Sequence, residues 1–202
     1  MSFSRYEVYT SVQSIYCYPD TDILRNKLNI RDQETLKTVE EEISAVKLFD
    51  LYQTPIRGRF SKSHLRRIHK YLFGDLYSFA GSFRKESISK GTTQFFPPQL
   101  IEREMDRVFE TIHNGKFLTE KSKSKQIDNL SFTMAELNII HPFREGNGRT
   151  IREFVRCMAL HYGLELNWEF VEKKEVLEAS ILSVDDPFAF TALIKHCISN
   201  QI

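Results

Sequence analysis

The stretch that decides the fold is residues 141–152, which read HPFREGNGRTIR. Pro142 has no backbone N–H and disfavours a helical conformation at the residue before it, so a helix is expected to end at His141 with the imidazole facing a cleft. Gly146 and Gly148 permit positive φ angles, which allow successive N–H groups to converge on an anion. The stretch therefore predicts a helix end followed by an anion-binding turn.

The second half of the stretch adds charged groups to that turn. Arg149 and Arg152 are three residues apart at the start of the next expected helix, so both project from one face of its first turn. Their guanidinium groups, the N–H groups of the turn and the helix dipole together make a cradle for a polyphosphate. Glu145 supplies a carboxylate, and Mg²⁺ typically binds through one or two carboxylates plus substrate phosphates. With His141 as a base for an incoming hydroxyl, the set predicts phosphoryl or nucleotidyl transfer.

The sequence on both sides of this stretch predicts a mostly α-helical bundle. Asp32 or a residue that follows it is expected to cap the first helix, and Ser61 or Ser63 the second. The first helix is assigned an apolar stripe of Leu36, Val39, Ile43, Val46, Leu48 and Phe49. Helices are predicted over residues 34–52, 64–77, 99–113, 126–140, 149–162, 173–182 and 187–199.

One segment, residues 81–98, does not follow the helical pattern. It is rich in Ser, Thr and aromatic residues, it has Lys90-Gly91 near its middle, and Pro97-Pro98 ends it. That composition predicts a β-hairpin.

Bulk properties limit the class of protein. The 202 residues suit one domain, and a net charge of +1 gives no overall field for nucleic acid or an anionic membrane. Three distant cysteines without a CxxC pair predict neither a disulfide framework nor a zinc site. Neither a leader pattern nor a run of about 20 apolar residues is present, so a cytoplasmic protein is expected. Residues 1–31 are interpreted as an irregular N-terminal arm that wraps onto a body of residues 32–202.

Residues 141–152 resemble the signature of the Fic-domain family, H-x-F-x-[D/E]-G-N-G-R-x-x-R, with every fixed position matched. Residues 68–84 are similar to the family's helix that leads into an active-site flap, and residues 88–98 resemble the flap hairpin. The resemblance covers roughly residues 32–162, with the flap at about 84–98. It implies an all-α fold, a helical bundle that carries one β-hairpin flap over the active site.

The resemblance also implies an activity and a set of roles. The activity is the transfer of AMP from ATP, with Mg²⁺, to a Ser, Thr or Tyr hydroxyl of a target protein. His141 would be the general base and Glu145 the metal-binding carboxylate. The phosphates would be held by the anion hole and the two arginines, namely Gly146, Asn147, Gly148, Arg149 and Arg152.

The flap and the regulation of the enzyme follow from the same resemblance. A target segment would dock by main-chain pairing on the flap at Lys90, Gly91, Thr92 and Thr93. Family members are often inhibited by a helix with [S/T]-x-x-x-E-[G/N], and no complete copy is found here. Thr38–Glu42 comes closest, but Ile43 follows where Gly or Asn is expected. The chain therefore resembles members whose inhibitory helix is on a separate antitoxin, a possible partner, or members that lack such a helix, and it is interpreted as a toxin or effector.

Two other functions remain open at this point. The same site could transfer another group, such as UMP, GMP, phosphate or phosphocholine, because the signature fixes a phosphate geometry and not the base. Alternatively, the chain is a non-enzymatic anion-binding adaptor, against which the near-neutral charge and the intact His141 argue. Nucleic acid and membranes are not expected partners.

Overall fold

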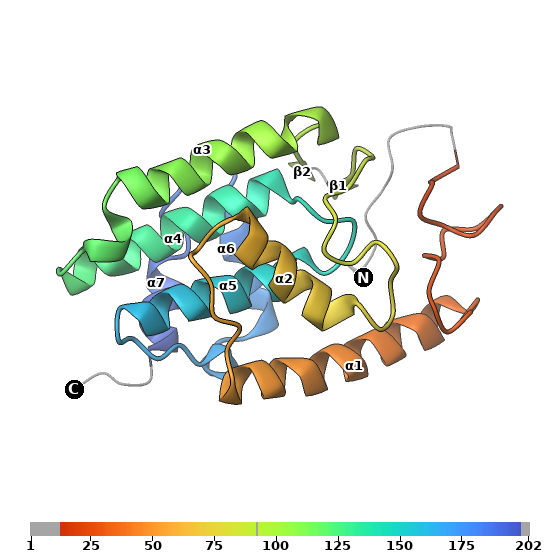
Figure 1. The fold of residues 1–202 in the computed structure, drawn as a ribbon, viewed down its shortest axis with the longest axis horizontal. Coiled ribbons are helices and arrows are strands. Elements are labelled where there is room, and N and C mark those ends of the chain that lie inside the picture. The colour runs from red at the N-terminus through yellow and green to blue at the C-terminus, as the bar shows by residue number, and fades with distance from the viewer. Residues whose placement is uncertain (1–12, 92, 199–202) are drawn as a thin grey trace.

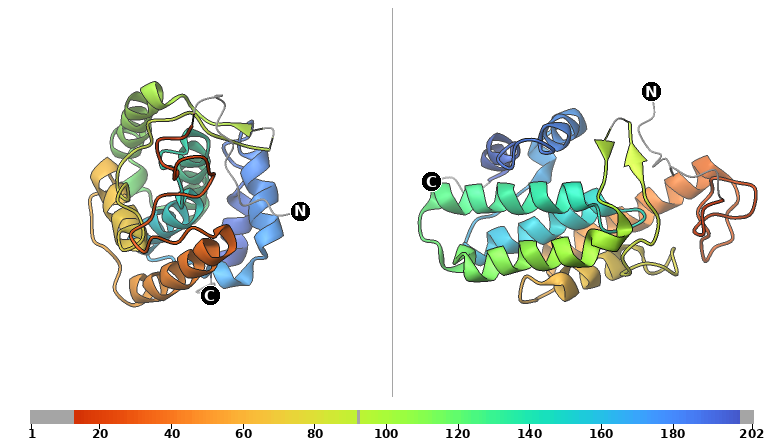
Figure 2. Two further views of the ribbon diagram at one scale, coloured as in Figure 1. Left: turned by 90° about the vertical axis from the view of Figure 1, so that its right-hand side faces the viewer. Right: turned by 90° about the horizontal axis from the view of Figure 1, so that it is seen from above.

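The computed structural model describes residues 13–91 and 93–198. These residues form seven α-helices and one two-stranded hairpin, which confirms the expected all-α fold with a single hairpin. Figure 1 shows α3, α4 and α5 lying along one another, with α1 along the lower edge and the hairpin near the end of the bundle where α1 begins. The view from above in Figure 2 places α6 and α7 together on the side of the bundle away from α2.

The helices occur close to their predicted positions. The largest differences are an earlier end for the second helix and a later start for the last one. The bounds are α1 Gln33–Gln53, α2 Lys62–Phe73, α3 Ile101–Asn114, α4 Lys123–Ile140, α5 Asn147–His161, α6 Lys173–Leu182 and α7 Thr191–Cys197, with short 3₁₀ turns at Pro98–Leu100, Phe117–Thr119 and Trp168–Phe170.

Two N-caps were predicted correctly. The Asp32 carboxylate accepts a hydrogen bond of 2.8 Å from the backbone N–H of Thr35, and Ser61 Oγ accepts one of 3.4 Å from His64. These bonds satisfy backbone donors that a helix start leaves without an intrahelical acceptor. The choice between Ser61 and Ser63 therefore falls on Ser61.

The prediction for the apolar stripe of α1 was partly wrong. Val46 is 64% exposed and Phe49 is 66% exposed, whereas Leu36 and Leu51 are buried. The body covers a narrower face of α1 than its apolar pattern suggests, and that face includes a buried polar residue, Ser44. Spacing alone could not reveal which part of a broad apolar stripe would be covered.

The core is organised around α5. This helix packs against α2 and α4, and its buried residues include Phe154, Val155 and Met158. Because α5 begins at Asn147, directly after the glycine-rich turn, the packing that stabilises the bundle also fixes the position of that turn.

The hairpin is much shorter than the predicted segment of residues 81–98. Strand β1, Ser89–Lys90, pairs with β2, Thr93–Gln94, in antiparallel register with Lys90 opposite Thr93. Gly91 lies in the turn with φ +58°, and Thr92 lies outside the described residues. The remainder of the segment is irregular backbone, whose hydrogen bonds go partly to Arg84.

The described part of the N-terminal arm, residues 13–31, contacts the body at the end of α2. The Lys27 backbone N–H donates to the carbonyl of Leu76 at 2.8 Å, and its ammonium donates to the carbonyl of Gly74 at 2.6 Å. Among the residues that the structure describes, no helix combines the length and apolar character required to cross a bilayer.

Candidate active site

His141 is the C-cap of α4 and has a left-handed backbone conformation, with φ 50° and ψ 61°. Its N–H donates to the carbonyl of Leu137 at 3.0 Å, and Pro142 follows. The Arg84 guanidinium donates to the carbonyl of His141 at 2.8 Å and to that of Ile140 at 3.2 Å. Arg84 thus neutralises the carbonyl end of α4 and holds the chain reversal that presents the histidine.

The imidazole of His141 has a defined tautomer. Its Nδ1 lies 2.8 Å from the carbonyl oxygen of Asn138, which can only accept, so Nδ1 carries the proton and Nε2 is the basic nitrogen. The ring of Phe95, just past β2, stacks on the imidazole with centroids 3.7 Å apart. Burial lowers the pKa of His141 to about 3. The ring is therefore neutral at physiological pH, as a general base must be before it accepts a proton.

The loop after His141 is held by side chains that point inward. The amide of Asn147 accepts from the N–H of Phe143 at 2.9 Å and donates to its carbonyl at 2.8 Å. Phe143 is fully buried and stacks on His69, with centroids 3.8 Å apart. His69 accepts from the N–H of Gly81 at Nδ1, at 2.8 Å, so its Nε2 donates to the carbonyl of Glu145, at 2.9 Å. Asn147 can therefore serve an anion only through its backbone, at the start of α5.

The two glycines of the turn have different roles, which corrects the expectation that both adopt positive φ. Gly146 has φ +75°, and a Cβ there would lie 2.2 Å from the ring of Phe73. Gly148 is helical, since α5 already begins at Asn147 and not near Arg149. A Cβ on Gly148 would lie 3.3 Å from the guanidinium of Arg152, so this glycine leaves space beside that group.

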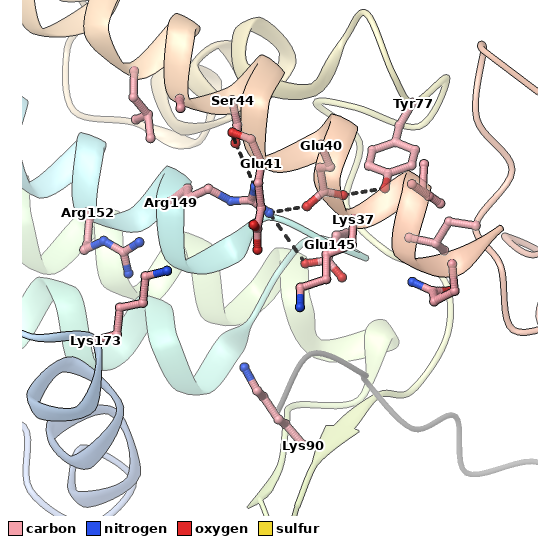
Figure 3. Close-up of a pocket in the computed structure, with 15 residues that line it drawn as sticks. Lys37, Glu40, Glu41, Ser44, Tyr77, Lys90, Glu145, Arg149, Arg152 and Lys173 are labelled. Carbon is pink, nitrogen blue, oxygen red and sulfur yellow. Dashed lines mark hydrogen bonds and ion pairs between the residues drawn. The ribbon is translucent and has the colours of Figure 1, made fainter. Parts of the chain in front are cut away.

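Figure 3 shows that Arg149 is held from the α1 side of the cavity. Its guanidinium pairs with the carboxylate of Glu40, donates to Ser44 Oγ at 2.8 Å and lies over the ring of Phe73 at 4.7 Å. Glu40 also accepts from the hydroxyl of Tyr77. Helix α1 therefore supplies a carboxylate to the first signature arginine.

Glu145 lies beside this pair, with an oxygen 4.0 Å from the Arg149 guanidinium and its side chain 20% exposed. Its Oε1 accepts from the Gly146 N–H at 2.9 Å. Burial and then the charge of Glu40 raise the pKa of Glu145 above its ordinary value. A cation in the cavity would favour the anionic carboxylate, so the site fits a hard ion held by one carboxylate and by phosphate oxygens. No cluster of three His, Cys, Asp or Glu suited to a metal occurs in the described ranges.

The cavity at the signature has two lobes. The α1 lobe, about 490 Å³, lies along Lys37, Glu40 and Ser44. The flap lobe, about 520 Å³, lies between the flap and α6, and α6 lines it with Val176, Leu177, Ser180 and Ile181. Both lobes share a junction, which we define by the lining residues that they have in common: Lys90, Glu145, Arg149, Arg152 and Lys173.

The structure thus brings most of the predicted site residues to one cavity. His141, Gly146, Asn147, Gly148, Lys90, Gly91 and Thr93 line the flap lobe, together with the junction residues Glu145, Arg149 and Arg152. Thr92 cannot be placed, because it lies outside the described residues.

Several residues that matter here were not found by sequence reasoning. Glu40 and Lys173 line the cavity from helices that are remote from the signature in the sequence. His69 and Arg84 hold the signature loop by hydrogen bonds to the carbonyls of Glu145 and His141. Glu42, the expected counterpart of an inhibitory glutamate, is exposed on α1, whereas Glu40 points to the signature. With 3.6 residues per turn, these two positions lie roughly 200° apart around the helix, so they point to opposite sides. This difference could have favoured Glu40 over Glu42 only if the buried face of α1 had been known.

Comparisons with known proteins identify the family of the chain. The model of the Fic/DOC family matches residues 59–159. The chain is 37% identical over 168 residues to the protein adenylyltransferase VbhT of Bartonella schoenbuchensis, covering 83% of this chain and 35% of that protein. It is 35% identical over 160 residues to a probable protein adenylyltransferase Fic of Escherichia coli, covering 79% and 78%. The chain thus spans about a third of VbhT and most of the second relative.

Solved structures share the fold. The N-terminal Fic domain of an effector from Bartonella sp. AR 15-3 has a TM-score of 0.82 at 25% identity, covering 92% of this chain and 91% of that one. BepC of Bartonella tribocorum, solved with bound AMPPNP, also has a TM-score of 0.82, at 22% identity, covering 93% and 97%. The all-α bundle with its hairpin is therefore an arrangement that these proteins have in common.

Proposed function

The chain belongs to the Fic/DOC family, and we propose that it is a protein adenylyltransferase that moves AMP from ATP to a Ser, Thr or Tyr hydroxyl of a target protein. The observation that carries the proposal is the placement of His141, a neutral histidine with a basic Nε2, beside a turn that opens a helix carrying Arg149 and Arg152. Residues 32–202 are assigned to the catalytic domain and residues 1–31 to an arm. The proposed location is the cytoplasm, where ATP is available.

The chemistry follows from the site. Nε2 of His141 accepts the proton of the target hydroxyl while that oxygen forms a bond to the α-phosphorus of ATP. The bond from the α-phosphorus to the oxygen that bridges to the β-phosphorus breaks, and its electron pair leaves with pyrophosphate. The N–H groups at the start of α5 and the two signature arginines stabilise the negative charge that builds on the phosphates.

Glu145 is the residue proposed to hold Mg²⁺. When bound, the ion supplies positive charge that stabilises the phosphate oxygens. The half-buried carboxylate lies at the junction of the two lobes, which supports this role.

The flap lobe suits the nucleoside. Apolar side chains of α6 and the ring of Phe95 lie near polar groups of Asn138 and Ser180, which is the mixture that a base and ribose require. BepC, which shares the fold, was solved with the bound nucleotide AMPPNP. UTP, GTP and a phosphocholine donor remain the competing substrates, because these lining residues carry no group that selects one base unambiguously.

The target is proposed to dock on the flap by main-chain pairing at residues 90–93, which places its hydroxyl beside His141. A separate antitoxin is proposed to supply the inhibitory helix that this chain does not carry as a complete motif.

Mass spectrometry after incubation with Mg²⁺ and a single nucleotide tests the function. ATP should add the mass of AMP to the protein itself or to proteins of a lysate, and His141→Ala should abolish the addition. An added mass of UMP, GMP or phosphocholine would identify that group, and not AMP, as the one transferred. Nucleotide binding without any covalent addition would refute the enzyme and leave an adaptor.

A further inference from the structure

The junction of the two lobes contains a lysine that no signature position accounts for. Lys173 is the first residue of α6, and it lines both lobes together with Arg152. In Figure 3 its side chain reaches toward Arg152, and Lys90 of the flap extends from the opposite side of the same space. Three cations from α5, α6 and the flap therefore border one part of the cavity.

The backbone that carries Lys173 is well fixed. Helix α6 begins with a capping box. The Glu172 side chain accepts from the backbone N–H of Glu175, and the Glu175 side chain accepts from the backbone N–H of Glu172. The Glu172 N–H donates to the Glu175 carboxylate at 2.7 Å. These bonds hold the start of α6 in place, so the position of Lys173 at the junction is set by the helix start and not by a mobile loop.

The charges at the junction show which ligand Lys173 suits. Arg149 is already paired with Glu40, and an oxygen of Glu145 lies 4.0 Å from the same guanidinium, so two carboxylates lie beside one cation. A nucleoside triphosphate carries most of its charge on the β- and γ-phosphates, and that part needs further cations. Arg152 and Lys173, on the side of the junction away from Glu145 in Figure 3, provide them.

We propose that Lys173 binds the β- and γ-phosphates of the nucleotide and the pyrophosphate that leaves, which makes it a leaving-group residue of this enzyme. The inference rests on the proposed function, because it assigns the direction in which the triphosphate lies. When the bond between the α-phosphorus and the bridging oxygen breaks, the electron pair stays on that oxygen, and the ammonium of Lys173 stabilises the resulting pyrophosphate. In this role Lys173 moves no proton, because His141 is the base.

The chain offers a matched control in the next residue. Lys174 occupies the same helix turn and carries the same charge, but it does not line the cavity and instead pairs with Glu178 at 3.7 Å. Lys173→Gln and Lys174→Gln therefore change the net charge equally and differ in whether the lost charge faces the junction.

The test measures the binding of ATP, AMP and pyrophosphate, each with Mg²⁺, by calorimetry in the His141→Ala background, where no AMP is transferred. Lys173→Gln should weaken ATP and pyrophosphate by about tenfold, the usual scale for one charge-assisted contact, and should leave AMP within about twofold. Lys173→Arg should restore most of the ATP affinity, and Lys174→Gln should change none of the three.

Equal loss of ATP and AMP affinity in Lys173→Gln would overturn the inference, because it would indicate a contact to the nucleoside or a changed fold. Unchanged ATP affinity in Lys173→Gln would also overturn the inference. A separate measurement of AMP transfer by the chain without any substitution distinguishes failure of the inference from failure of the proposed function. If it transfers AMP while Lys173→Gln binds ATP normally, only the inference fails. If it transfers nothing while the difference between ATP and AMP persists, the inference stands and the proposed function fails.

Discussion

Two segments face each other across the flap lobe and are built in opposite ways. The signature loop, residues 141–148, is fixed by buried side chains: Phe143 and Asn147 are fully buried, and His141 is 5% exposed. The flap, residues 84–98, pairs over only two residues in each strand, and its turn at Gly91 has no atom near the position of a Cβ. The loop is buried over most of its length, whereas the flap combines buried residues such as Ile88 and Ser89 with an open turn at Gly91.

This difference separates catalysis from target selection. General-base and phosphate contacts require groups held within a fraction of an ångström, which the loop achieves by hydrogen bonds from His69, Arg84 and Asn147. A surface that receives a protein segment by main-chain pairing can remain adaptable, because the backbone supplies the contacts. The two segments touch where Phe95 stacks on His141 and where Arg84, the first residue of the flap, donates to the carbonyls of His141 and Pro142.

The largest effect should come from the loop. His141→Ala should lower AMP transfer by about 10²–10⁴, the usual contribution of a general base, while the melting temperature and ATP affinity stay close to those of the parent protein. Single-turnover labelling with ATP, together with calorimetry, would measure both quantities. His196→Ala, which removes an exposed histidine of α7, serves as the control. Near-normal transfer by His141→Ala would place the base elsewhere.

A pair of glycines tests the comparison directly. Gly146 and Gly91 both have positive φ, at +75° and +58°, but an added Cβ meets Phe73 at 2.2 Å in the first case and nothing within 4 Å in the second. Gly146→Ala combines backbone strain with overpacking and should cost about 2–5 kcal/mol of unfolding free energy. Gly91→Ala should cost at most about 1–2 kcal/mol, because only the local strain of the turn is added.

Urea denaturation of the two variants gives the measurement. Gly163→Ala is a second control, since this glycine also has positive φ, +76°, with open space around it. If Gly91→Ala destabilised the protein as much as Gly146→Ala, the flap would be part of the cooperative core, and the contrast drawn between the two segments would be wrong.

The sequence revealed the loop better than its surroundings. Helix ends, caps at Asp32 and Ser61 and the turn at Gly146 follow from local chemistry, so they could be predicted. Gly148 was expected to have a positive φ like Gly146, but it lies inside α5 and is helical. Glu40 and Lys173 could not be found, since their roles depend on how α1 and α6 pack around the cavity, which no local pattern encodes.

The core around α2, outside both segments, should be sensitive to acid. His64 is buried, donates from Nε2 to the carbonyl of Ile56 at 2.7 Å, and has a pKa lowered by burial. The unfolded chain takes up a proton near pH 6.5 that the folded chain takes up only at lower pH, so stability is lost as pH falls below about 6.5. Each such histidine adds a slope of up to about 1.4 kcal/mol per pH unit.

Unfolding free energies between pH 7.5 and 5 would reveal this slope. His64→Phe, placed among the rings of Phe60 and Phe154, should be less stable at pH 7.5 because a hydrogen bond is lost, but its stability should fall less steeply with acid. An unchanged slope in this variant would show that the folded protein accommodates a charged His64.

The smallest effect is expected at Glu42, and its neighbour Glu40 gives the contrast. Glu40→Gln removes the charge that pairs with Arg149 and accepts from Tyr77, so it should destabilise the half-buried network by about 1–3 kcal/mol and lower transfer as Arg149 loses its anchor. Glu42 is exposed, so Glu42→Gln should change both stability and transfer little, within about 0.5 kcal/mol. Initial rates of ATP-dependent labelling, measured without any partner protein, distinguish the two positions. Tenfold activation by Glu42→Gln would mean that this chain inhibits itself through a conformation in which α1 turns its outer face inward. Weak effects at Glu42 together with loss of activity at Glu40 would instead assign α1 a supporting role and leave inhibition to a separate helix.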